Sequence, residues 1–126
     1  MIERIFYIGL GSGIGGIFRY LMSVSIYHVL GKYFPYGTLF VNALGSFLIG
    51  FLFIILLPRM DDPNNHLPAF VLVGLLGGFT TFSSFSLESI NLLEEGKVTL
   101  FLINILASVG ICISLTWLGI LLGREL

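Results

Sequence analysis

Hydrophobic residues fill four long stretches of the chain, and few polar residues separate them. The apolar stretches cover approximately residues 5–30, 37–57, 67–93 and 98–122. Each stretch reaches the roughly 20 residues that an α-helix needs to cross about 30 Å of hydrocarbon. The segments between them are short and rich in charged or turn-forming residues. This pattern predicts an all-α membrane protein of four transmembrane helices in which sequential helices are antiparallel.

The composition agrees with a membrane environment. The 126 residues are 56% hydrophobic and 10% charged, whereas soluble domains carry about 25% charged residues. We therefore expect residues 1–126 to form a single transmembrane domain in a lipid bilayer. The formal net charge of −1 gives no electrostatic basis for a nucleic-acid partner. The one cysteine, Cys112, lies in an apolar stretch, and we interpret it as a small packing residue.

The first apolar stretch is a candidate signal peptide because Arg4 precedes it. No small-x-small cleavage motif follows it, however, and three more hydrophobic stretches do. We therefore expect this first segment to be retained as a membrane span.

Basic residues outside the spans are almost balanced between the two sides of the membrane. Four spans place both termini on one side, together with Arg4, Arg59 and Arg124, and place Lys32 and Lys97 on the other. Loop lysines and arginines set the orientation of a membrane protein, so three against two gives almost no bias. Such a chain can insert both ways and pair with its inverted copy. Insertion in one orientation is the alternative.

Residues 11–16 (GSGIGG) match the G-x-G-x-x-G pattern of dinucleotide sites. Such a site needs an alternating strand–helix fold with an acidic residue about 20 positions further on. Here membrane spans follow, and no acidic residue occurs between Glu3 and Asp61. Glycines four residues apart instead favour close approach of another helix in lipid. The first span contains two such pairs, Gly9 with Gly13 and Gly11 with Gly15.

The third span contains the most unusual stretch, residues 74–86 (GLLGGFTTFSSFS). Paired glycines loosen a helix, and a carbonyl freed in hydrocarbon must find a partner. We therefore expect the third helix to be broken near Gly77–Thr80, where freed carbonyls can coordinate a cation. Phe79, Phe82 and Phe85 recur every third residue between hydroxyl side chains. Aromatic stripes usually serve packing, but ring edges and hydroxyl donors can also face a small anion.

Isolated polar side chains within the spans have two interpretations each. Arg19 is either a tie between helices or part of an anion pathway. Asn42 forms either an interhelical hydrogen bond or a donor for an anion, and Asn104 with Ser108 one turn later offers the same choice. Glu88 either caps or lines a vestibule near the end of the third span or acts in the pathway itself.

Three motifs together resemble the Fluc (CrcB) family of fluoride channels over essentially the whole chain. They are residues 15–20 (GGIFRY), residues 35–42 (PYGTLFVN) with Gly45 and Gly50, and residues 77–86 (GGFTTFSSFS) with Glu88. The resemblance implies a dual-topology homodimer of antiparallel four-helix subunits with two narrow pores, in the plasma membrane of a prokaryote. It also implies a passive, fluoride-selective channel, not an enzyme, that lets cytoplasmic fluoride leave down its electrochemical gradient and confers fluoride resistance.

The resemblance assigns roles to individual residues. Asn42 corresponds to the pore asparagine, and Phe82 and Phe85 to paired aromatics whose ring edges face fluoride. Gly77 and Thr80 correspond to residues whose backbone carbonyls enclose a structural sodium ion at the dimer interface. Our further fluoride-pathway candidates are the polar residues Arg19, Thr81, Ser83, Ser84, Glu88 and Ser108.

The resemblance leaves two questions open, one about a pore residue and one about the partner subunit. Asn104 stands where many family members carry tyrosine, so the resemblance does not extend to its pore contact. Some organisms make two such proteins that work only as an oppositely oriented pair, so a heterodimer with a paralogue is the alternative partner.

Two other function classes also fit a four-span chain. A proton-coupled small multidrug-type exporter needs a carboxylate facing a central chamber, but Glu88 lies late in the third span and the first span has no acidic residue after Glu3. A non-transporting assembly subunit predicts that Phe82→Ile or Asn42→Ala leaves the cellular phenotype unchanged.

Overall fold

All regular secondary structure is helical in the computed structural model, which describes residues 1–126. Four helical stretches are long and apolar enough to cross a membrane: Ile2–Leu30, Tyr36–Arg59, Ala69–Glu94 and Val98–Glu125. The prediction of an all-α chain with four membrane-capable spans is therefore confirmed. No predicted span boundary differs from these bounds by more than three residues.

The third stretch is divided among several elements, whereas the others are long α-helices. In chain order the elements are α1 (Ile2–Leu30), α2 (Tyr36–Leu56), the 3-10 turn η1 (Leu57–Arg59), the π-helix η2 (Ala69–Leu75), α3 (Leu76–Phe79), α4 (Phe82–Glu94) and α5 (Val98–Glu125). Turns at Gly31 and Gly96 follow α1 and α4, and both glycines have positive φ values, 83° and 79°. Glycine favours these positions because it tolerates the left-handed region.

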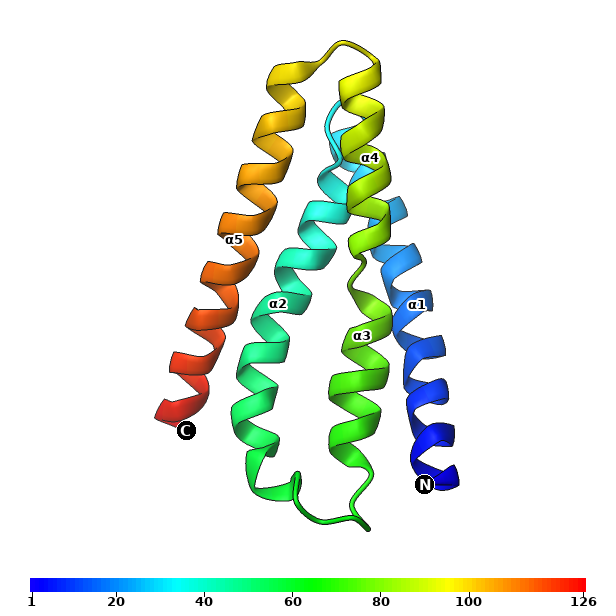
Figure 1. Cartoon of the computed structure of the whole chain (residues 1–126), viewed down its shortest axis with the longest axis vertical. Coiled ribbons are helices and arrows are strands. Elements are labelled where there is room, and N and C mark those ends of the chain that lie inside the picture. Colours follow the sequence, from blue (N-terminus) through cyan, green and yellow to red (C-terminus); the bar gives the residue numbers. More distant parts are fainter.

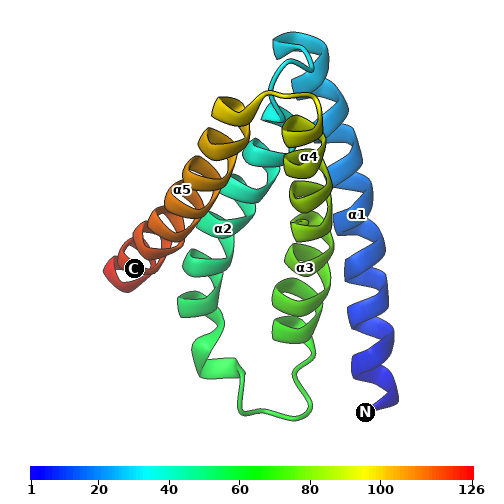
Figure 2. The same cartoon turned by 45° about the horizontal axis from the view of Figure 1, so that its top comes forward.

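The helices lie side by side in the order α5, α2, third stretch, α1 (Figure 1). α2 packs against α5, α1 packs against η2 and α3, and α1 and α5 make no contact. Both termini lie toward the end of the molecule that carries the connection between η1 and η2 (Figure 1). Figure 2 shows α5 leaning away from α1, so the subunit is an open array of helices and not a closed bundle.

Glycines bring the backbones of α1 and the third stretch together. A Cβ atom added at Gly11 would lie 2.5 Å from the Phe70 carbonyl oxygen, and one added at Gly15 would collide with the Leu75 carbonyl oxygen. Gly9 and Gly13, by contrast, have no atom within 4 Å of such a Cβ position. Of the two predicted glycine pairs, only Gly11 with Gly15 therefore packs inside the subunit.

The subunit covers little of its own apolar surface. Only 22 of the 126 residues are buried, and large hydrophobic side chains are exposed along every long helix. An exposed apolar area of this extent requires lipid or another protein around it.

We expect Gly15→Ala to destabilise the fold and Gly13→Ala to leave it nearly unchanged. The alanine at position 15 meets the backbone of Leu75 and Phe79, and overpacking of this kind lowers the free energy of unfolding by about 1–3 kcal/mol. The alanine at position 13 enters open space, so its effect should stay within about 0.5 kcal/mol. Thermal unfolding in detergent, followed by Trp117 fluorescence, measures both. Equal midpoints for the two variants would contradict this packing.

Candidate functional site

The backbone between α3 and α4 is extended at two residues. Thr80 has φ −85° and ψ 157°, and Thr81 has φ −149° and ψ 117°. The preceding Gly77 and Gly78 hold a helix poorly, and Thr81 starts α4 as its N-cap, since its hydroxyl oxygen accepts the Ser84 N–H at 3.2 Å. We call these two residues the Thr80–Thr81 segment.

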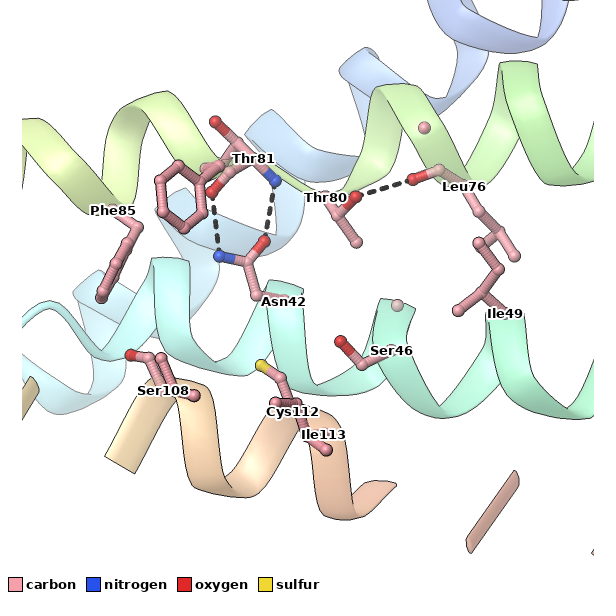
Figure 3. A pocket seen from close by; sticks show the side chains of 14 residues that line it. Asn42, Ser46, Ile49, Leu76, Thr80, Thr81, Phe85, Ser108, Cys112 and Ile113 are labelled. Carbon is pink, nitrogen blue, oxygen red and sulfur yellow. Dashed lines mark hydrogen bonds between the residues drawn. The ribbon is translucent and has the colours of Figure 1, made fainter. Parts of the chain in front are cut away.

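Asn42 of α2 pairs with the backbone of Thr81 through both ends of its amide. Asn42 Oδ1 accepts the Thr81 N–H at 2.7 Å, and Asn42 Nδ2 donates to the Thr81 carbonyl at 2.9 Å (Figure 3). In an uninterrupted helix the Thr81 N–H would bond to the Gly77 carbonyl. The amide oxygen thus replaces the Gly77 carbonyl as the acceptor of the Thr81 N–H, and the two hydrogen bonds together fix α2 to the extended segment.

Arg19 of α1 makes the second side-chain contact with this region. Its Nε donates to the Gly78 carbonyl at 3.1 Å. That carbonyl lies at the C-terminal end of α3, where a positive charge is favourable. Arg19 therefore ties α1 to α3, and it does not line the cavity described next.

A cavity of about 340 Å³ lies where the Thr80–Thr81 segment faces α2 and α5 (Figure 3). Its walls carry hydroxyl, amide, thiol, aromatic and aliphatic groups, with no carboxylate, amine, guanidinium or imidazole. The fourteen lining residues are Asn42, Gly45, Ser46, Ile49, Leu76, Gly77, Thr80, Thr81, Phe82, Phe85, Ser108, Val109, Cys112 and Ile113. Such a lining supplies hydrogen-bond donors and ring edges without a full charge.

Phe82 and Phe85 both line the cavity, at opposite extremes of exposure. The ring centroids lie 5.3 Å apart with the planes tilted by 54°. The exposed fraction is 75% for Phe82 and 9% for Phe85. Phe79 precedes the extended segment, is buried and does not line the cavity. The three phenylalanines therefore do not form the continuous aromatic stripe that their spacing predicts.

Ser108 of α5 lines the cavity, and a series of hydrogen bonds connects it to α4. The Ser108 hydroxyl donates to Asn104 Oδ1 at 3.3 Å, and Asn104 Nδ2 donates to the Ser89 hydroxyl oxygen at 2.8 Å. The Ser89 hydroxyl in turn donates to the Phe85 carbonyl at 2.7 Å. Asn104 is 1% exposed and does not line the cavity. We call these four groups the α4–α5 relay.

Glu88 lies outside the cavity and joins three helices. Its Oε1 accepts the Thr38 hydroxyl at 2.6 Å, and its Oε2 accepts the Tyr27 hydroxyl at 3.1 Å. Together with Lys32 and Lys97, Glu88 and Tyr27 border a separate cavity of about 320 Å³ at the end of the subunit near Gly31 and Gly96. The structure therefore separates Glu88 from the Asn42 cavity.

Ser83 and Ser84 follow the extended segment without lining the cavity. The Thr81 hydroxyl lies 3.2 Å from the Ser84 hydroxyl and 3.3 Å from the Ser83 hydroxyl. Of the predicted pathway residues, the structure gathers Asn42, Thr81, Phe82, Phe85 and Ser108 around one cavity, with Gly77 and Thr80 of the predicted sodium site. It places Arg19, Ser83, Ser84 and Glu88 around or beyond that cavity.

Ser46 and Ser89 are not among the residues that the sequence predicts for the site, and Cys112, predicted to be a packing residue, faces the cavity. A spacing of four residues was the available signal, because residues four apart share a helix face. Small polar residues recur at this spacing on the two helices that pack together, as Thr38, Asn42 and Ser46 on α2 and Asn104, Ser108, Cys112 and Thr116 on α5.

The chain matches the family model described as "CrcB-like protein, Camphor Resistance (CrcB)" over residues 6–120. It is similar to proteins named fluoride-specific ion channel FluC in several bacteria. The protein of Coxiella burnetii (strain CbuK_Q154) is 48% identical over 98% of this chain and 99% of its own length. That of Magnetococcus marinus is 47% identical over 96% and 98%, and that of Shewanella halifaxensis 42% identical over 94% of each chain.

We expect Asn42→Ala to loosen the Thr80–Thr81 segment. The change leaves the part-buried Thr81 N–H without its acceptor and removes one donor to the Thr81 carbonyl, and an unpaired buried N–H costs about 1–3 kcal/mol. Amide hydrogen exchange in a peptide covering residues 80–84 should speed up by about tenfold or more. Asn91→Ala, an exposed amide on α4, is the matched control. Unchanged exchange in Asn42→Ala would show that the amide does not hold this segment.

Proposed function

Because the chain belongs to the CrcB family, we propose that it is a passive, fluoride-selective ion channel. It would let cytoplasmic fluoride leave across the plasma membrane of a prokaryote, and so confer fluoride resistance. The relatives described above carry the name of such a channel. Ion conduction of this kind involves no enzymatic reaction.

The observation that carries this proposal is the uncharged cavity beside the Thr80–Thr81 segment, in which a few hydrogen-bonding groups stand among apolar ones. Fluoride is small and strongly hydrated, so a path through a membrane must replace its water with hydrogen-bond donors. The cavity offers the hydroxyls of Ser46, Thr81 and Ser108 and the amide of Asn42. The Phe82 and Phe85 rings add edges of partial positive charge.

Because the lining contains no charged side chain, it favours passage of an ion and does not bind the ion tightly. An ion crosses a channel only when each site is favourable enough to enter and weak enough to leave. A lysine or arginine in the lining would hold an anion strongly in this low-dielectric place. The N-terminal end of α4 contributes a weaker, fixed positive potential beside Phe82.

We propose that the pore is completed by a second, antiparallel copy of the chain. The Phe82 ring lines the cavity yet is 75% exposed on the isolated subunit, so a partner surface would supply the missing wall. The nearly balanced Arg and Lys residues of the two ends permit both orientations. A paralogue of opposite orientation is the alternative partner.

We propose that the Gly77 and Thr80 carbonyls hold a sodium ion at this interface. The Thr81 N–H, which a continuous helix would give to the Gly77 carbonyl, goes to Asn42, and the Ser84 N–H, which would go to the Thr80 carbonyl, is given to the Thr81 hydroxyl. Carbonyls released in this way are hard oxygen ligands for a cation. Bound there, sodium would supply a fixed positive charge that joins the two subunits.

The remaining predicted pathway residues would support the pore from outside its lining. We propose that Arg19 holds the end of α3 and that Ser83 and Ser84 hold the start of α4 through Thr81. Glu88, fixed by Thr38 and Tyr27, would shape the entrance near Gly31 and Gly96.

A proton-coupled exporter is not favoured by this arrangement. Such a protein needs a carboxylate in its substrate chamber, whereas the cavity contains none. Glu88 already accepts two hydroxyl hydrogen bonds between helices. An inside-negative membrane potential contributes about 2.3 kcal/mol per charge per 100 mV toward anion exit, so export needs no coupled proton.

We expect liposomes that contain only the purified protein to release fluoride and retain chloride. Fluoride release should persist without a pH gradient, because a channel needs only an electrochemical gradient for fluoride. Ion-selective electrodes follow both halides, and protein-free liposomes give the background. Equal release of the two halides, or fluoride release only with a proton gradient, would overturn the proposed function.

If the chain inserts in both orientations, a residue of the exposed loop after η1 lies outside the cell in some copies and inside it in the others. In a Cys112→Ala background, Asp61→Cys should react with a membrane-impermeant maleimide in about half of the copies on intact cells. Permeabilised cells, in which all copies react, provide the reference. Labelling of all or none of the copies on intact cells would establish a single orientation.

A further inference from the structure

The α4–α5 relay connects two cavity-lining residues through two residues that the cavity does not reach. Ser108 and Phe85 line the cavity, whereas Asn104 and Ser89 are 1% and 4% exposed and lie behind it. A purely space-filling role would not require two buried polar side chains, because burying them is unfavourable unless their hydrogen bonds are satisfied. The donor and acceptor of each hydrogen bond in the relay therefore matter, because together they orient the Ser108 hydroxyl.

The Phe85 carbonyl determines the donors and acceptors of the relay, because a carbonyl can only accept a hydrogen bond. The Ser89 hydroxyl gives its hydrogen to that carbonyl at 2.7 Å, so the Ser89 oxygen is an acceptor for its next neighbour. That neighbour is Asn104 Nδ2, at 2.8 Å. The amide of Asn104 is thereby held with Oδ1 toward Ser108, and the Ser108 hydroxyl donates to it at 3.3 Å.

We propose that Asn104, held by Ser89, is a positioning residue that sets anion selectivity by keeping the Ser108 hydrogen directed away from the cavity. This proposal rests on the proposed function, the passage of fluoride through the cavity. While the relay is intact, Ser108 presents oxygen lone pairs toward the cavity. The Ser108 hydroxyl can donate to an anion only if it breaks its hydrogen bond to the amide oxygen of Asn104.

This exchange favours a strong acceptor over a weak one. The Ser108–Asn104 hydrogen bond is the longest of the relay, 3.3 Å against 2.8 Å and 2.7 Å, and a hydroxyl rotates freely to a new acceptor. Hydrogen bonds to an anion are stronger than neutral ones. Fluoride, the stronger hydrogen-bond acceptor of the two halides, then competes with the amide oxygen, whereas chloride competes poorly.

Ser89→Ala and Ser89→Thr test the proposal without changing the cavity lining. The alanine frees the Asn104 amide to turn its N–H toward Ser108, which leaves the Ser108 hydrogen available to either halide. Threonine keeps the hydroxyl that holds the amide. We expect Ser89→Ala to lower the ratio of fluoride to chloride release by about 3- to 10-fold, the factor that one hydrogen bond supplies. Ser89→Thr should have the same ratio of fluoride to chloride release as the unchanged protein.

A double-variant comparison separates this role from general loosening of the helices. Once Ser108→Ala has removed the hydroxyl, adding Ser89→Ala should change the ratio no further. Asn104→Leu serves in the same comparison if Ser89→Ala folds poorly. Thr116→Val, which removes hydroxyl contacts of α5 with the Ser46 and Cys112 carbonyls, is the control and should leave the ratio unchanged.

Two results would overturn the inference. In the first, Ser89→Ala slows both halides in proportion, as a structural defect would. In the second, Ser89→Ala lowers the ratio equally with and without the Ser108 hydroxyl. Either result removes Asn104 and Ser89 from selectivity while fluoride release by the unchanged protein still upholds the proposed function. Failure of the unchanged protein to release fluoride would overturn the proposed function itself, and the inference with it.

Discussion

The pairing of Asn42 with the Thr81 backbone is the interaction on which the site depends. Hydrocarbon leaves no water for a peptide group outside a helix, so an extended segment at membrane depth needs a partner from the protein. The Asn42 amide provides an acceptor and a donor to the same residue, at 2.7 Å and 2.9 Å. Because this pairing stabilises the segment, α4 can begin as a new helix with Phe82 and Phe85 directed to the cavity wall.

Close backbone packing brings α1 within hydrogen-bond distance of the third stretch. Gly11 and Gly15 let α1 approach the third stretch so closely that a methyl group does not fit. At this separation Arg19 reaches the Gly78 carbonyl and neutralises the C-terminal end of α3. Small residues therefore create the proximity, and the polar contacts that follow fix the position of the Thr80–Thr81 segment relative to α1 and α2.

The hydrophobic pattern determines the four spans because membrane thickness dictates their length. Asn42 and Ser108 were predictable because they are polar residues within apolar spans, whereas Phe82 and Phe85 were singled out by their spacing and by the family resemblance. The contacts of Glu88 were not predictable in this way, because they depend on which helices are neighbours: its partner Tyr27 lies 61 positions away. The extended backbone likewise separates Phe79 from Phe82, which a helical spacing alone treats as one stripe.

The donors around the cavity share one property that single residues do not reveal. Most already make a hydrogen bond within the protein, as Asn42 does with Thr81, Thr81 with Ser84, and Ser108 with Asn104. An ion that takes one of these donors exchanges a hydrogen bond and does not gain an additional one, so the net attraction is reduced. A path of this kind can dehydrate a small anion and still release it, because each protein group has an internal partner to which it returns.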